Sequence, residues 1–233
     1  MILWVPMGTR FLQFSWDMQK IDPKSPLYPK AFHTLTDPPQ QFFYSGPPSW
    51  LEVPMLAIVG ARDALPWVQT WLEQELLPVL QKQPVCIVSG GARGIDQWAH
   101  ILASRAGLPT IAVLPSGIRH LYPKNLNRLS GKIAFLSEYE PEQAMRKFHF
   151  YKRNRLIPVM ATGLLVVQAQ VKSGTMMTAQ MAIDQGCPVA TLPASPYMEN
   201  FSGNLKLIME GAQMVRGQGD LQLWLQQCLN KKG

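Results

Sequence analysis

The sequence predicts an α/β protein with a doubly wound, mostly parallel sheet and helices on both of its faces. Two observations predict this fold class. Several short segments between residues 55 and 193 are continuous apolar runs, as in strands that are covered on both faces. Helical stretches separate these runs, and regular alternation of strand and helix is typical of parallel sheets.

Six apolar runs are the expected strands: residues 55–60, 85–90, 110–117, 132–138, 164–169 and 188–193. The expected helices are residues 66–78, 95–105, 153–161, 175–185, 204–211 and 219–229. Pro66 suits the first turn of the first helix, and Pro78 is expected to end or kink it. Gly107 is a typical residue after the end of the second helix.

The remaining parts of the chain differ from this core. Residues 1–50 are rich in proline and aromatic residues, so we expect a short N-terminal helix and an extended segment packed on the core. The core is expected to span residues 51–215, followed by a C-terminal helix over residues 216–233 without a winged-helix module.

The composition favours a polyanionic partner and argues against other classes of protein. The formal net charge is +7, a balance that is typical of proteins that bind nucleic acid. The three cysteines, Cys86, Cys187 and Cys228, have neither zinc-site nor disulfide-framework spacing. No apolar run reaches the roughly 18 residues that span a bilayer, and the N-terminus lacks the basic start of a signal peptide. We therefore expect a cytoplasmic protein with no membrane partner, metal or cofactor.

The segment VSGGARGIDQWAH, residues 88–100, is the clearest candidate site. Ser89, Gly90, Gly91, Ala92 and Arg93 follow an apolar strand and lead into a helix. Glycines allow close approach of an anion, helix-start N–H groups point at it, and an arginine can grip a phosphate.

Other turns are expected at the same edge of the sheet. Gly60-Ala61-Arg62, Ser116-Gly117 and Ser173-Gly174-Thr175 also follow predicted strands. Ligands of open α/β sheets bind outside the carboxyl ends of the strands, so these turns predict an anion-binding rim. Neither the dinucleotide fingerprint nor the Walker A loop is present.

A second candidate is the basic and aromatic segment RKFHFYKRNR, residues 146–155. Lys152, Arg153 and Arg155 stand among aromatic residues that include Phe150. Cations that follow a phosphate backbone and rings that stack on bases are the pairing used to bind single strands. The alternative is a solvated helix whose rings belong to the core.

Candidate catalytic groups are few. Asp96 and His100 are four residues apart and could touch on one helix face, although Asp96 also suits the positive start of its own helix. Glu138 and Glu140 at a strand end could bind a cation or a ribose hydroxyl. We assign no catalytic residue.

Ordered motifs along the chain resemble the DNA-processing protein A family, also called DprA or Smf. They are SPLYPKAF, DPPQQFFYSG, GAR (60–62), SGGARGIDQWAH (89–100), YPKNL (122–126), SE (137–138), RNRLI (153–157), SGTMMTA (173–179) and GNLKLIMEGA (203–212). The resemblance covers about Ser25 to Ala212.

This resemblance implies an extended Rossmann-like domain that dimerises and binds single-stranded DNA without being an enzyme. Such proteins protect incoming strands and help to load a RecA-type recombinase in natural transformation. The implied binding residues are Arg62, Ser89, Gly90, Gly91, Ala92, Arg93, Phe150, Lys152, Arg153, Arg155, Ser173 and Gly174. Ala61, Gln168 and Pro193-Ala194 depart from the family pattern of Ser, Glu and Pro-Gly.

Two other functions remain open at this stage. A nucleotide-binding or nucleotide-hydrolysing enzyme or sensor would use Glu138 or Asp96 on a ribose, although a PGGxGTxxE-like motif is absent. A purely structural scaffold would leave both the glycine turns and the basic, aromatic segment without a role.

Overall fold

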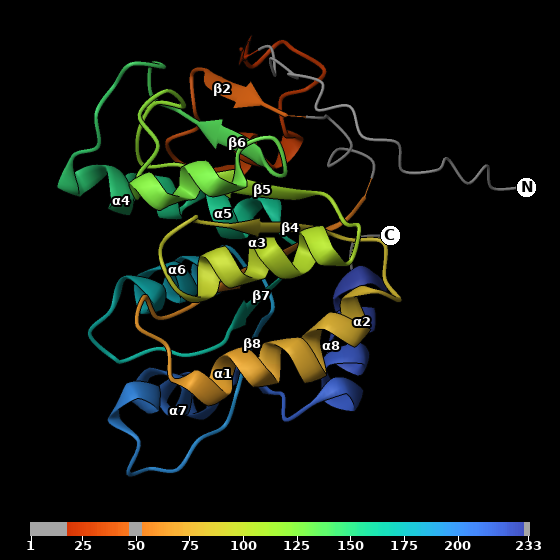
Figure 1. Ribbon diagram of the computed structural model, residues 1–233. Helices are drawn as coiled ribbons and strands as arrows, with labels where there is room; N and C mark the ends of the chain where they lie inside the picture. The colour runs from red at the N-terminus through yellow and green to blue at the C-terminus, as the bar shows by residue number, and fades with distance from the viewer. Residues whose placement is uncertain (1–17, 47–52, 231–233) are drawn as a thin grey trace, which may run out of the picture.

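The computed structural model describes residues 18–46 and 53–230, which form one nine-stranded sheet with helices on both faces (Figure 1). The strand order is β1-β2-β6-β5-β4-β3-β7-β8-β9, and all pairs from β6 to β9 are parallel. The strands are β1 (Gln19–Ile21), β2 (Phe42–Ser45), β3 (Met55–Val59), β4 (Cys86–Ser89), β5 (Thr110–Val113), β6 (Ala134–Ser137), β7 (Gly163–Val166), β8 (Val189–Thr191) and β9 (Gln213–Met214).

The order of the strands reverses beside β3. From β3 the chain adds β4, β5 and β6 on one side, then returns to add β7, β8 and β9 on the other. The loops after β3 and β7 therefore diverge at the carboxyl edge, where open α/β sheets bind their ligands. This edge lies on the left in Figure 1.

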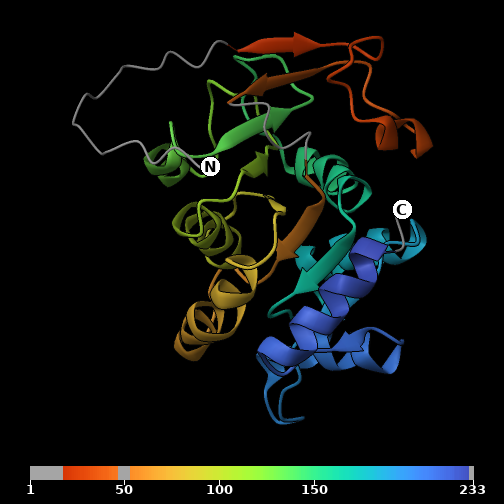
Figure 2. The ribbon, with the colours of Figure 1, turned by 90° about the vertical axis from the view of Figure 1, so that its right-hand side faces the viewer.

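Two hydrophobic layers cover the sheet because successive side chains of a strand point to opposite faces. On β3, Ala57 and Val59 belong to one buried cluster and Leu56 and Ile58 to the other. Figure 2 shows α3 on one side of the sheet and α5 on the other.

The first layer contains α1 (Pro66–Trp71), the π-helical η3 (Leu72–Leu76), α2 (Leu77–Leu80), α3 (Ile95–Arg105) and α8 (Gln218–Asn230). The opposite layer contains the 3₁₀ helix η1 (Lys30–Thr34), α5 (Leu156–Met160) and α6 (Gly174–Asp184). The other helical elements are η4 (Lys124–Leu129), α4 (Lys147–Asn154), η5 (Glu199–Phe201) and α7 (Ser202–Met209).

The predicted fold class and all six predicted strands are confirmed, whereas Pro78 does not end the first helix, which was one of the two outcomes expected for it. The helical course continues to Leu80 through the π segment. Leu77 N–H bonds to the Leu72 carbonyl, five residues back. This wider turn directly before Pro78 accommodates a residue that cannot donate a backbone hydrogen bond.

The proline-rich region adds strands to the sheet that its sequence did not reveal. β2 pairs antiparallel with β6, with Phe43 opposite Ser137, and β1 pairs antiparallel with β2. The helix expected near the N-terminus falls in residues 1–17, outside the described residues. The helix expected at residues 153–161 begins earlier, at Lys147, and is divided into α4 and α5.

Candidate functional site

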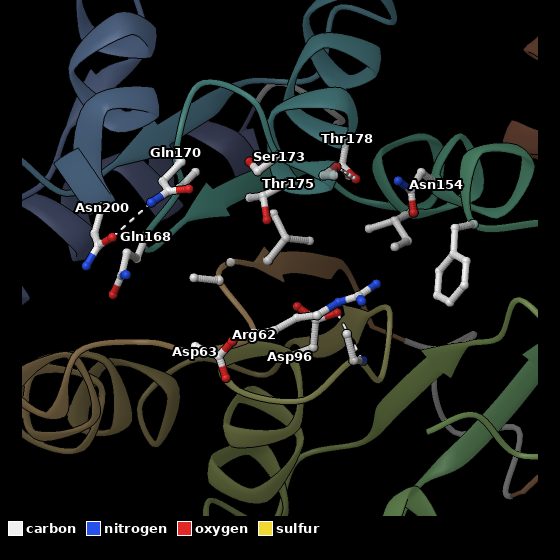
Figure 3. A pocket seen from close by; sticks show the side chains of 18 of the residues that line it. Arg62, Asp63, Asp96, Asn154, Gln168, Gln170, Ser173, Thr175, Thr178 and Asn200 are labelled. Atoms are coloured by element: carbon white, nitrogen blue, oxygen red, sulfur yellow. Dashed lines mark hydrogen bonds between the residues drawn. The ribbon is translucent and has the colours of Figure 1, made fainter. Parts of the chain in front are cut away.

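A cavity of about 520 Å³ opens at the point where the strand order reverses. Figure 3 shows its polar walls: α6 and the loop before it supply Ser173, Thr175 and Thr178, opposite Arg62, Asp63 and Asp96, with Asn154 at one end and Gln168, Gln170 and Asn200 at the other. A volume of this size suits a small ligand or a single nucleotide unit.

The start of α6 forms one wall of this cavity. Ser173 is the N-cap residue, and its hydroxyl accepts a hydrogen bond from Met176 N–H at 3.3 Å. A β-carbon added at Gly174 would meet nothing within 4 Å. The first turn of α6 therefore has open space beside it, next to N–H groups that lack helical partners.

The turns after β3 and β4 lie directly against each other. Gly94 has a φ of +78°, and a β-carbon there would meet the carbonyl oxygens of Ala61 and Arg62. Ile95 N–H also donates to the Ala61 carbonyl at 3.2 Å. Glycine is therefore required at residue 94 both for its backbone conformation and for this close approach.

Gln168, which follows β7, holds the turn after β3 through two hydrogen bonds. Its side-chain oxygen accepts a hydrogen bond from Leu65 N–H at 3.0 Å, and its carbonyl accepts one from Ala61 N–H at 2.8 Å. The residue is buried and lines the cavity. A neutral amide therefore stands at this wall of the cavity.

Arg153 supports the turn after β4 from beneath. Its side chain is buried, with 5% of the residue exposed. Its Nη1 donates hydrogen bonds to the carbonyls of Gly90, at 2.6 Å, and Val113. A β-carbon at Gly90 would collide with this guanidinium group. Arg153 thus occupies the space that the glycine leaves free.

Asp96 is a buried carboxylate within the same turn. Its Oδ2 accepts a hydrogen bond from Ala92 N–H at 3.3 Å. Burial raises the pKa of Asp96 to about 6, although Arg153 and the N–H groups of the turn oppose this shift. The residue serves the start of its own helix, which was one of the two roles considered for it.

His100 does not pair with Asp96. Its Nδ1 lies 2.7 Å from the hydroxyl oxygen of Thr110, whose own proton is donated to the Ile87 carbonyl. The Nδ1 atom must therefore carry the hydrogen of this contact. Burial, together with the positive charge of Arg153, lowers the pKa of His100 to about 3, so the ring is neutral at pH 7.

A smaller cavity of about 240 Å³ adjoins the first, sharing Arg62, Ala92 and Phe150 with it. We call the two cavities together the groove. The Arg62 guanidinium carbon lies 5.3 Å from the centre of the Phe150 ring. Tyr122 meets the same ring edge-to-face at 5.7 Å. A cation and two rings therefore stand where the cavities join.

Arg93 lies at the exposed rim of the groove. Its side chain is 60% exposed, and its Nη2 lies 2.9 Å from the carboxylate of Asp63, which is 87% exposed. Such an exposed ion pair contributes little to stability, so a ligand phosphate can replace Asp63 as the partner of Arg93.

The other predicted cations lie outside the groove. Arg155 donates two hydrogen bonds to the Glu138 carboxylate, at 2.6 and 2.7 Å. Lys152 lies 3.5 Å from Asp37. Both cations line a separate cavity of about 1250 Å³. Ser89 is also apart, since it is buried and donates its hydroxyl proton to the Ile58 carbonyl at 2.6 Å.

The structure therefore brings together only part of the predicted site. The predicted residues that line the groove are Arg62, Gly90, Ala92, Arg93, Phe150, Ser173 and Gly174. The buried Arg153 also lines the cavity of about 520 Å³ that forms part of the groove. Gly91, with a φ of +67°, shapes the turn. Tyr122, Asn154 and Gln170 also line the groove and were not predicted, although the YPKNL and RNRLI motifs contain the first two of them.

Residues 18–46 and 53–230 contain no group of three or more histidine, cysteine, aspartate or glutamate side chains that is arranged to hold a metal ion. Within the same ranges, no helix has the length and apolar character needed to cross a membrane.

Fold and site define a Rossmann-like α/β protein with a basic, aromatic groove at the reversal of its sheet. Residues 19–225 match the family model for DNA recombination-mediator protein A. The chain belongs to this family.

Sequence relatives agree with this assignment. The chain is 36% identical over 198 residues to the DNA processing protein DprA of Streptococcus pneumoniae, covering 83% of this chain and 70% of that protein. It is 34% identical to the DprA of Bacillus subtilis, covering 83% and 67%.

Solved structures show the same fold. DprA from Streptococcus pneumoniae aligns with a TM-score of 0.82 at 33% identity, covering 88% of this chain and 73% of that one. DprA from Helicobacter pylori, described as binding single-stranded DNA, aligns with a TM-score of 0.79 at 28% identity, covering 91% and 97%. A molybdenum cofactor binding protein from Rippkaea orientalis, at 16% identity and a TM-score of 0.54, shares the fold alone.

Proposed function

We propose that this protein binds single-stranded DNA without strong sequence preference, in the groove at the carboxyl edge of its sheet. The observation that carries the proposal is the placement of Arg62 over the Phe150 ring at the junction of the two cavities. A phosphate can bond the guanidinium group while a base stacks on exposed aromatic surface beside it.

Phosphate contacts would come from both walls of the groove. Arg62 and Arg93 supply charge on one side, and the first turn of α6 supplies N–H groups on the other. Contacts to the backbone are shared by all sequences, so affinity is expected to fall steeply with salt and to vary little with base composition.

The lining would also favour single strands over duplex. Phe150 and Tyr122 offer ring surface to a base. The side-chain amides of Asn154, Gln168 and Gln170 line the cavity of about 520 Å³ within the groove. Bases can reach such groups only when they are unpaired and splayed away from a stack. A duplex would present its phosphates to the rim but leave its bases enclosed.

The remaining predicted cations would act differently. Arg153 would position Gly90 and the turn rather than touch phosphate, because its guanidinium group is buried against carbonyl oxygens. Lys152 and Arg155 would contribute to the positive potential around the groove without entering it.

We further propose that the protein acts in DNA processing during natural transformation, as a homodimer that protects incoming strands and helps to load a RecA-type recombinase. Large apolar side chains on the C-terminal half are exposed, including Met209, Met214 and Leu223. A self-complementary contact between two copies would cover side chains of this kind. Analytical ultracentrifugation of the full chain tests the dimer.

Fluorescence anisotropy tests the central proposal, with labelled single-stranded and duplex oligonucleotides at two salt concentrations. The wild type is expected to prefer single strands and to lose affinity as salt rises, and Arg93→Ala is expected to bind about fivefold more weakly. Equal binding of duplex and single strands, or unchanged binding by the variant, would contradict the assignment of the groove.

Of the two carboxylates of the nucleotide-enzyme alternative, only Asp96 lines the groove. Its Oδ2 accepts a hydrogen bond from Ala92 N–H within its own turn, and Glu138 is held by Arg155 outside the groove. Release of a base from a nucleotide panel, abolished by Glu138→Gln, would reinstate this alternative.

A further inference from the structure

The first turns of α4 carry exposed aromatic and basic side chains that the groove does not use. Phe148 and Tyr151 are 59% and 58% exposed. They are three residues apart and therefore neighbours on one side of the helix. Both line the cavity of about 1250 Å³, on the other side of α4 from the groove. Two neighbouring rings in contact with water are costly to maintain without a partner.

Two cations stand at the start of the same helix. Arg146 and Lys147 are exposed, and neither side chain forms an ion pair with any described residue. The first turn of α4 contains no acidic residue. Cations at this end of a helix are unfavourable for the helix dipole, so helix stability does not explain them. Asp37 and Asp184 line the cavity beside the rings, and Asp37 is paired with Lys152 and Arg155. Arg146 and Lys147 are therefore the cations of this surface that a polyanion can contact.

This surface is continuous with the groove because α4 supplies residues to both. Phe150, which lies between Phe148 and Tyr151 in sequence, points into the groove and contacts Arg62. Successive residues of a helix are separated by about 100°, so a single turn of α4 presents one ring to the groove and two rings to the outer surface.

We propose that Phe148 and Tyr151, with Arg146 and Lys147, form a second stacking surface that binds the same DNA strand after it leaves the groove past the start of α4. This inference rests on the proposed function and extends its site. The rings would stack on bases in any sequence, while the two cations contact the intervening phosphates. Strands long enough to reach around α4 would then bind more tightly than strands that only fill the groove.

The test compares thymidine oligonucleotides of about 6 and about 20 nucleotides, bound to the full chain and measured by anisotropy. The Phe148→Ala/Tyr151→Ala double variant is expected to lose about tenfold in affinity for the longer strand and to bind the shorter one like the wild type. Both side chains are largely exposed, so the fold should be retained. The matched control is Tyr197→Ala, which removes a ring that is 96% exposed and lines neither the groove nor the cavity beside Phe148.

The possible outcomes separate this inference from the proposed function. Wild-type affinity of the double variant for both strands overturns the second surface alone and assigns the rings to a protein partner. An equal loss for both strands also overturns it, because the rings would then act within the groove. Failure of the wild type to bind either strand overturns the proposed function and this extension together. Photo-crosslinking of 5-iododeoxyuridine in the longer strand to Tyr151 is the expected direct readout.

Discussion

The Nη1 atom of Arg153 donates a hydrogen bond to the carbonyl oxygen of Gly90 at 2.6 Å. The same guanidinium group occupies the volume that a side chain at Gly90 would need. The arginine from α4 and the glycine after β4 therefore depend on each other. The buried guanidinium group fits only where residue 90 has no side chain, and it holds the turn that faces the groove. The two residues are 63 positions apart in the chain.

Replacement of Arg153 by methionine should destabilise the protein by about 3 kcal/mol, since it leaves buried carbonyl oxygens without donors. Arg153→Lys should recover less than half of this loss, because a single ammonium group cannot reproduce the planar set of donors. Urea unfolding measures both effects. Wild-type stability of either variant would show that the turn does not depend on this arginine.

Removal of the negative charge at Asp63 should strengthen DNA binding. Asp63→Asn frees Arg93 and removes a carboxylate that repels phosphate, so affinity should rise about threefold at low salt and converge with the wild type at high salt. The matched control is Glu73→Gln, which releases Arg105 from a similar exposed pair at 3.2 Å. An equal gain in both variants would indicate a general charge effect rather than a site.

Gly174→Ala separates stability from binding at the start of α6. The new β-carbon meets no atom within 4 Å, so stability should be unchanged or rise by up to about 1 kcal/mol. If a phosphate approaches this backbone, the methyl group should weaken DNA binding about fivefold. Gly219→Ala in α8, which also has open space, serves as the control. Unchanged DNA affinity would place the strand away from α6.

The buried His100 should make the protein sensitive to acid. Its pKa is about 3 in the folded protein and about 6.5 when unfolded, so the unfolded chain binds more protons between these values. Stability is therefore lost as the pH falls from 7 towards 3. Between pH 7 and pH 5 the wild type should lose about 2 kcal/mol more than His100→Gln. Asp96, whose pKa is raised, contributes to the pH dependence of stability with the opposite sign, and this contribution cancels when the wild type is compared with the variant. Equal losses of stability in the two proteins would contradict a neutral, buried His100 ring.

The sequence predicted the central sheet because its strands are buried on both faces. Runs such as residues 85–90 leave few alternatives to a covered parallel strand. The short β2 was not recognised because it pairs with β6, which is distant in the chain, and the three-residue β1 pairs in turn with β2. The helix does not end at Pro78 because a π-helical turn before the proline accommodates it, and the sequence gives no signal for such a turn.

The site was predicted in outline, and its internal arrangement depended on contacts between distant residues. Turns at strand ends placed Arg62 and Arg93 correctly on one edge. The sequence of the basic segment did not show which of its cations face the groove. In the structure, Lys152 and Arg155 lie away from the groove and pair with Asp37 and Glu138. The burial of Arg153 likewise depends on carbonyl oxygens of two other strands.

The salt dependence of single-strand binding by Arg62→Ala, measured beside Arg105→Ala, tests most directly whether the groove binds the DNA. Both arginines carry the same charge, but only Arg62 lies in the groove. Arg62→Ala is expected to weaken binding about tenfold and to reduce the slope of log affinity against log salt by about one, while Arg105→Ala leaves both unchanged. Equal effects of the two variants would mean that net charge, rather than the groove, binds the DNA.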